Sequence, residues 1–138
     1  MRRAACWLMA MLVCHFRVAC GDDLQYDIAY TSNRIEGQTG IYLHAHDGER
    51  LLSTAFTMAE APTWSPDGKK LAFQAKVKDR WDIYVMDVDS RKHNQLTDDA
   101  HGDFHPVWSP NGSTISFYSD RSSQARIWLI ESDGTNLR

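Results

Sequence analysis

Cysteine is scarce in this sequence and confined to its beginning. The only three cysteines are Cys6, Cys14 and Cys20, so a chain that has lost its first residues keeps at most one. An internal disulfide is then excluded, and the domain must be stabilised by packing alone.

Basic residues are also few. The chain has 15 Lys and Arg against 18 Asp and Glu, and loss of Arg2, Arg3 and Arg17 would leave a formal net charge of −6 with neutral histidines. No basic run is present that could neutralise a series of phosphates. Nucleic acid is therefore excluded as the expected partner.

The N-terminal hydrophobic run is short. Residues 4–14 carry no charge and follow Met1-Arg2-Arg3, but a membrane-spanning helix needs about 20 apolar residues. The run also lacks the polar face of a helix that packs on a core. It therefore predicts a secretory signal peptide over residues 1–20.

The end of this segment leaves two alternatives. Val18-Ala19-Cys20-Gly21 resembles the end of a bacterial lipoprotein signal, in which the cysteine is lipidated and becomes the new N-terminus. Arg17 departs from that pattern, so ordinary cleavage near Ala19 or Cys20 stays open. Either way we expect export, to the periplasm or as a lipoprotein anchored to the membrane through Cys20 alone.

An internal repeat dominates the rest of the chain. The segment PTWSPDG at residues 62–68 returns 44 residues later as PVWSPNG at residues 106–112. The segments LAF at 71–73 and IYVMD at 83–87 return at the same spacing as ISF and IWLIE. Repetition at this period is the signature of a repeat architecture.

The repeat divides residues 21–138 into three units. An earlier, partial copy begins with IAY at residues 28–30. We expect the units to cover about residues 27–56, 61–97 and 105–138, of which the first lacks its opening strand and the last stops early.

Each unit predicts short strands joined by turns. In the turn at residues 65–68, proline presets φ, aspartate bonds the local backbone and glycine takes a positive φ; the second copy has Asn for Asp. The recurring tryptophans are expected to pack between units. The residues that we assign to this structural motif are Trp64, Pro66, Asp67, Gly68, Trp108, Pro110, Asn111 and Gly112.

The strands are apolar on both faces, as in residues 83–86 and 127–130. Sheets covered on both sides and repeated every 40–45 residues or so are typical of propeller blades. The sequence therefore predicts an all-β fold, a partial β-propeller of four-stranded antiparallel blades after an N-terminal signal segment.

The pattern P-x-W-S-P-[DN]-G, followed by [LI]-[AS]-F and I-[YW]-[VL]-[MI]-[DE], resembles the TolB-like propeller repeat (WD40-like, PD40) over about 110 residues. The resemblance implies a non-catalytic protein-binding module of the cell envelope without a cofactor, and relatives bind the peptidoglycan-associated lipoprotein. Similar repeats also occur in lipoproteins, in carbohydrate lyases and in propellers of prolyl-oligopeptidase-type hydrolases.

Few residues point to catalysis or to a metal. A Gly-x-Ser-x-Gly motif is absent, and Asp87-x-Asp89 lacks the glycine and glutamate of a calcium loop. His44 and His46 are expected to be solvated. One polar stretch has two interpretations, a metal or lyase site and a solvated loop. It contains His93, Asp98, Asp99, His101, Asp103 and His105. We expect His105 to precede the first strand of its unit.

Three units are too few to close a propeller, which typically has four to eight blades. Two alternatives stay open: a truncated product, or two or more copies that associate into a ring. Partner binding is expected in the loops where the copies differ most, at residues 76–80, 101–105 and 122–126.

Overall fold

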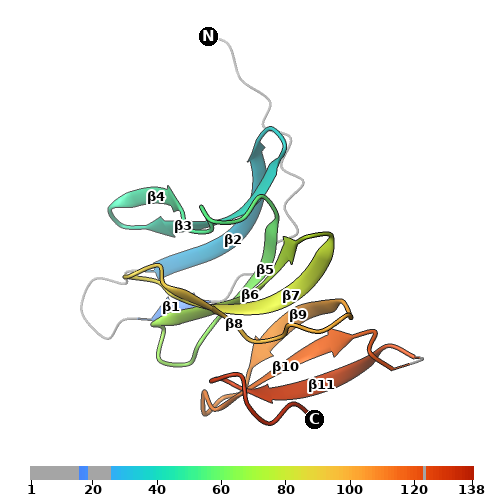
Figure 1. Cartoon of the computed structure of the whole chain (residues 1–138). Helices are drawn as coiled ribbons and strands as arrows, with labels where there is room; N and C mark the ends of the chain where they lie inside the picture. Colours follow the sequence, from blue (N-terminus) through green and yellow to red (C-terminus); the bar gives the residue numbers. More distant parts are fainter. Residues whose placement is uncertain (1–15, 19–25, 123) are drawn as a thin grey trace.

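The computed structural model describes residues 16–18, 26–122 and 124–138. These residues form three antiparallel sheets in chain order and contain no helix (Figure 1). The expectation of an all-β fold is confirmed. Within the described part of the chain, a helix of the length and apolar character needed to cross a membrane is therefore not found.

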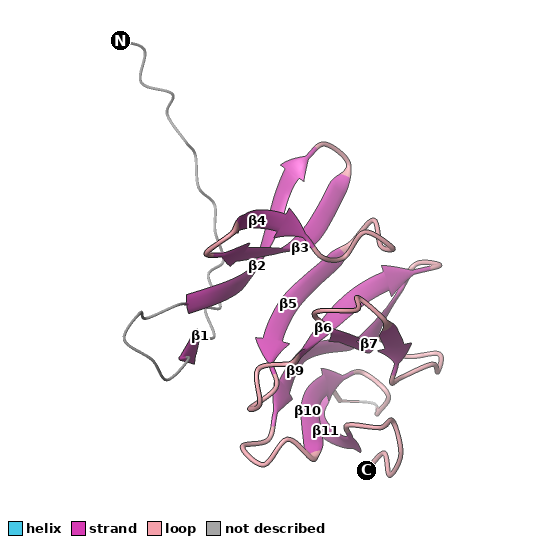
Figure 2. Ribbon diagram, turned by 90° about the vertical axis from the view of Figure 1, so that its left-hand side faces the viewer, coloured by secondary structure: helices cyan, strands magenta, loops and turns pink. Residues whose placement is uncertain are grey.

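We call the three sheets blades 1, 2 and 3. Blade 1 contains β1 (Phe16–Val18), β2 (Tyr26–Ile35), β3 (Gln38–Ala45) and β4 (Gly48–Leu51). Blade 2 contains β5 (Ala59–Trp64), β6 (Lys70–Val77), β7 (Arg80–Asp87) and β8 (His93–Gln95). Blade 3 contains β9 (Asp103–Trp108), β10 (Thr114–Ser119) and β11 (Arg126–Glu131). Strands that are consecutive in the chain are neighbours in each sheet, and loops join them at the sheet ends (Figure 2).

The first and last blades differ from the expected pattern. In blade 1, β1 pairs with β2 in the position that β5 holds in blade 2. Most of the predicted signal peptide, with Cys20, lies outside the described residues, so its removal stays a prediction. Blade 3 has three strands, but Arg138 exchanges backbone hydrogen bonds of 2.8 and 2.9 Å with Leu129, which is where a fourth strand would begin.

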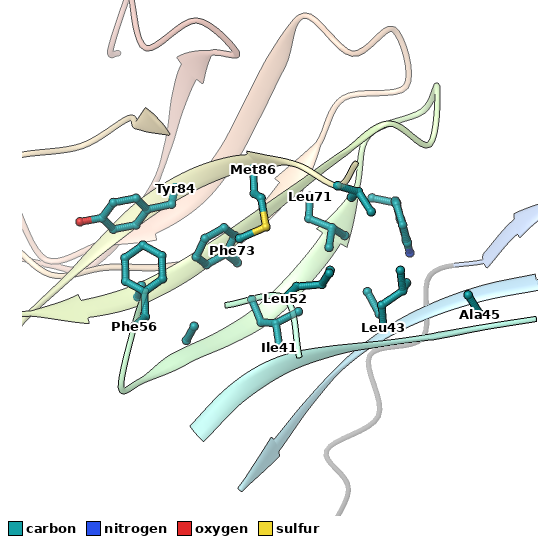
Figure 3. Packing of buried hydrophobic residues seen from close by; sticks show 14 residues of the cluster. Ile41, Leu43, Ala45, Leu52, Phe56, Leu71, Phe73, Tyr84 and Met86 are labelled. Carbon is teal, nitrogen blue, oxygen red and sulfur yellow. The ribbon is translucent and has the colours of Figure 1, made fainter. Parts of the chain in front are cut away.

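Blade 2 buries both of its faces, because alternate residues of its strands point to opposite sides. Phe73 and Met86 on one face pack against blade 1 (Figure 3). Ile83 on the other face packs against Phe117 of blade 3. A fully buried side chain of this size contributes about 1.5–3 kcal/mol, so these two interfaces hold the three blades together.

The recurring turns have the same geometry in both full copies. The amide of Gly68 donates to the carbonyl of Ser65 at 2.8 Å, and that of Gly112 donates to Ser109 at 2.9 Å. Both glycines have positive φ, +67° and +73°. Asp67 and Asn111 accept the preceding serine hydroxyl at 2.6 and 2.7 Å.

Candidate docking surface

Three loops meet at one end of blades 2 and 3. They are the β6–β7 turn, the β8–β9 connection and the β10–β11 turn, which include the segments that the sequence singled out as variable. The amide of Gly102 donates to the carboxylate of Asp120 at 2.9 Å, and Arg80 Nη2 lies 2.8 Å from Asp98. We call this region, residues 76–82, 96–104, 118–122 and 124–126, the charged rim.

A buried ion pair fixes the base of the charged rim. Arg121 Nη2 donates to both carboxylate oxygens of Asp103 at 2.8 Å, and Arg121 Nη1 lies 3.2 Å from Asp99. Asp103 is fully buried and the Arg121 side chain nearly so. The guanidinium also stacks over Trp128, 5.0 Å from the ring centroid. A desolvated pair in which one guanidinium nitrogen contacts both carboxylate oxygens, beside an aromatic ring, holds one geometry.

Asp82 forms a second anchor, on blade 2. Its buried carboxylate accepts from Arg80 Nε at 3.3 Å and from Gln95 Nε2 at 3.2 Å. Burial raises the pKa of the Asp82 carboxyl, and the hydrogen bond from Arg80 opposes that rise. Arg80 also contacts Asp98, so it connects β7 to the β8–β9 loop.

The outer layer of the charged rim is open to solvent. The side chains of Asp98 and Asp120 are 78% and 60% exposed, and His101 lies 3.5 Å from Asp120. Charged groups that stand on a rigid base and face water can steer and orient a protein partner.

A row of aromatic rings adjoins these charges. Phe104 lies between Trp81 and Tyr118, with ring centroids 6.3 and 6.4 Å apart. Tyrosine and tryptophan are enriched at protein interfaces because they combine apolar area with a polar group. Sequence reasoning missed this row. The sequence did contain a signal for it, because the other full copy has no aromatic residue at these positions. Trp81, Phe104 and Tyr118 are matched there by Ala125, Glu60 and Gln74, respectively.

The structure does not bring the three candidate histidines together. His93 packs on Phe56, with ring centroids 5.0 Å apart, at the outer edge of blade 2. His101 faces Asp120. Within the described ranges no group of three or more potential metal ligands is present.

His105 requires a correction. It lies inside β9 rather than before it, at a position with φ +52° next to an irregularity in the β9–β10 pairing. Its side chain is exposed. The matching residue of blade 2, Ala61, has the same positive φ of +52°, so the conformation belongs to the repeat and does not mark a catalytic residue. His44 and His46 are exposed on blade 1.

The two recurring turns enclose a pocket of about 220 Å³, away from the charged rim. The ring of Pro66 and the indole of Trp108 line it. Trp64 is buried in the contact with blade 1, whereas Trp108 is half-buried against the contact of blades 2 and 3. The pocket therefore lies between packed turns, and polar side chains of these turns also line it, among them Asp67, Lys70 and Asn111.

Known proteins with similar sequences and structures share this architecture. The family model described as the TolB beta propeller domain matches residues 22–138. An uncharacterized protein of Agrobacterium fabrum is 34% identical over 108 residues, which are 77% of this chain and 37% of that protein. The Tol-Pal system protein TolB of Hahella chejuensis is 39% identical over 75 residues, 51% of this chain and 17% of that protein.

A solved structure described as a TolB from Agrobacterium tumefaciens superposes with a TM-score of 0.76 at 32% identity, covering 81% of this chain and 41% of that one. The predicted propeller fold is thereby confirmed. An acylaminoacyl peptidase superposes at 14% identity with a TM-score of 0.60, over 91% of this chain and 25% of that one, and shows the fold alone. This chain thus spans about two fifths or less of the length of these relatives.

Proposed function

This chain belongs to the TolB β-propeller family, and from that premise we propose that it is a non-catalytic protein-binding module of a bacterial cell envelope. The observation that carries the proposal is the charged rim. Exposed Asp98 and Asp120 stand on a base that the Arg121–Asp103 pair makes rigid, beside the ring of Phe104. Such a surface suits a partner with basic and aromatic groups.

The relationship to a Tol-Pal protein supports an envelope partner, because the relative from H. chejuensis is named for that system. Histidines 93, 101 and 105 lie apart, which leaves the rival function of a metal-dependent lyase without a gathered ligand set. A role as the propeller of a hydrolase has support from fold similarity at low identity only.

Charge reversal at the charged rim tests the proposal. The wild-type chain should retain an envelope protein in a pull-down from envelope extracts, and the double variant Asp98→Lys/Asp120→Lys should lose it. Asp89→Lys is the matched control, since Asp89 is exposed in the β7–β8 turn at the opposite end of blade 2. Equal retention by all three proteins would contradict docking at the rim.

The rival function is tested with His101→Ala/His105→Ala. Retention of the same partner by this variant supports docking without catalysis. Stoichiometric metal in the wild type, lost in the variant together with polysaccharide cleavage, would favour the lyase instead.

We also propose that the first 19 or 20 residues are removed on export. Mass spectrometry of the protein from the envelope fraction should show a chain that begins at residue 20 or 21. Added acyl chains on Cys20 would establish the lipoprotein form, whereas a chain that retains Met1 would contradict export. Removal would also take β1 away from the edge of β2.

A further inference from the structure

The pocket between the two recurring turns has both apolar and polar walls. The turns at residues 65–68 and 109–112 enclose a volume of about 220 Å³. Its apolar surface comes from the ring of Pro66 and from the indole of Trp108, which is only half-buried and so still offers part of its ring. Polar side chains also line it: Ser65, Asp67, Lys70, Asn111 and Ser132. A few polar groups beside apolar surface are typical of a small-molecule site.

The two turns hold polar atoms in place for a ligand. The hydrogen bonds that shape the turns are accepted by Oδ1 of Asp67, at 2.6 and 3.1 Å, and by Oδ1 of Asn111, at 2.7 and 3.1 Å. These bonds fix both side chains without using Oδ2 of Asp67, an acceptor, or Nδ2 of Asn111, a donor. Groups that are ordered before binding lose little conformational entropy when a ligand arrives.

The charges that line the pocket balance each other. Of the lining residues, Lys70 is the one cation and Asp67 the one anion, and both side chains are exposed. Exposed charges attract a free ion weakly, because water and salt screen them. The same screening counts against a zwitterion such as a free amino acid. The pocket therefore favours a neutral ligand that both donates and accepts hydrogen bonds.

A pyranose sugar has this chemistry, because its hydroxyls donate and accept while its C–H groups pack on aromatic and aliphatic rings. The pocket is smaller than the roughly 300–1,000 Å³ of drug-sized ligands, so it has room for one such ring. We propose that it binds one residue of a neutral sugar, with Trp108 and Pro66 against the C–H groups and with Asp67 and Asn111 bonded to hydroxyls. The sugar is bound and not cleaved.

This site is separate from the charged rim. The turn at residues 65–68 precedes β6, whereas the charged rim begins at residue 76, near the other end of that strand. The inference therefore goes beyond the proposed docking function and does not depend on it.

An NMR titration of the isotope-labelled chain with glucose, galactose and N-acetylglucosamine tests the proposal. The indole N–H groups of Trp64, Trp108 and Trp128 are buried and have no hydrogen-bond partner within the described residues, and each should give its own signal. The signal of Trp108 is identified by its loss in Trp108→Phe, which keeps an aromatic ring in the contact. At least one sugar should shift it saturably, with a Kd on the order of 1 mM, while Trp64 and Trp128 stay unchanged.

Two conservative variants test the polar contacts. Asp67→Asn and Asn111→Asp should each raise the Kd about tenfold, because each removes one of the two polar groups that the sugar contacts. Both should keep the turn, since this chain forms one turn with Asp and the other with Asn. Asp79→Asn is the matched control and should keep the wild-type Kd, because Asp79 is an exposed carboxylate of the β6–β7 turn, outside the pocket.

Three results would overturn the proposal. The first is the absence of a saturable shift of Trp108 with all three sugars. The second is a shift with alanine and not with the sugars, which would assign the pocket to a zwitterion. The third is an equal Kd for the wild type, Asp67→Asn, Asn111→Asp and the control, which would place the sugar elsewhere. The pull-down at the charged rim is read out separately, so failure of either proposal leaves the other standing.

Discussion

The backbone N–H of His105 donates a hydrogen bond of 2.8 Å to Oε1 of Gln74 on the preceding blade. The matching pair one blade earlier is Ala61 and Thr31, whose N–H and Oγ1 are 3.2 Å apart. In both places the donor has a positive φ and lies in the first strand of its blade, β5 or β9. A strained backbone position is therefore stabilised in each copy by a side chain from the neighbouring blade.

Loss of this bond should destabilise the contact of blades 2 and 3. Gln74 is 4% exposed, so Gln74→Ala leaves the N–H of His105 without its acceptor and should cost about 1–3 kcal/mol in unfolding free energy. Urea unfolding at one fixed protein concentration measures it. Gln124→Ala, in an exposed turn, should unfold like the wild type; equal effects of the two changes would contradict a specific role.

The two recurring tryptophans should differ in their contribution, although the sequence predicts the same packing role for both. Trp64 is 8% exposed within the larger core cluster, so Trp64→Ala should cost about 3–5 kcal/mol. Trp108→Ala should cost less, since Trp108 is only half-buried. Urea midpoints of the two variants would be compared directly, and a larger loss at Trp108 would contradict the burial that we describe.

The buried pair of Asp103 and Arg121 predicts a strong effect of removing one partner. Arg121→Met leaves a buried carboxylate without its counter-charge and should cost about 3–5 kcal/mol. The double variant Arg121→Met/Asp103→Leu should recover much of that loss, because no unpaired charge remains. Arg138→Met removes exposed contacts with Glu131 and with the carbonyl of Asn136 and should change stability by about 0–1 kcal/mol. Denaturant unfolding of all three variants checks the order.

Gly112 should tolerate asparagine better than valine. A Cβ at this position would lie 3.6 Å from Pro66, an ordinary contact, so the cost comes from φ of +73° and not from a clash. Gly112→Val should lose about 1–3 kcal/mol, and Gly112→Asn less, because asparagine adopts positive φ more readily. Thermal unfolding of the two variants at matched concentration would show it, and equal melting would contradict a conformational cause.

The turn at residues 65–68 of blade 2 should make the free energy of unfolding depend on pH in the acid range. Hydrogen bonds from the Ser65 hydroxyl and the Lys69 amide hold the pKa of the Asp67 carboxyl below its ordinary value. Because the folded pKa is the lower one, the unfolded chain binds more protons as pH falls. The stabilisation is present above the unfolded pKa of about 4 and is lost as pH falls through the folded pKa.

Asp67→Asn should therefore have a urea midpoint that falls less between pH 7 and acid than that of the wild type, while it keeps the acceptor that Asn111 provides in blade 3. Asn111→Asp should show the reverse, a steeper fall in acid. Parallel pH profiles for all three proteins would contradict the contribution of this turn.

The repeat and the turns could be read from the residues. The 44-residue spacing, the turns at 65–68 and 109–112 and strands apolar on both faces predict consecutive antiparallel blades, and the described structure contains them. These features are local: a glycine at a positive-φ position or an apolar residue on each face depends only on the few residues around it. The sequence by itself therefore determined the fold class of this protein.

The site depended on the tertiary structure. Asp103 begins β9 and Arg121 lies 18 residues later in the β10–β11 turn, and the two meet because β9 pairs with β10 in blade 3. The fold also separates His93 from His101 although they lie in one stretch of sequence. Residues of non-repeating loops are placed by strand pairing and by the stacking of blades, which are sums of long-range contacts that no local pattern records.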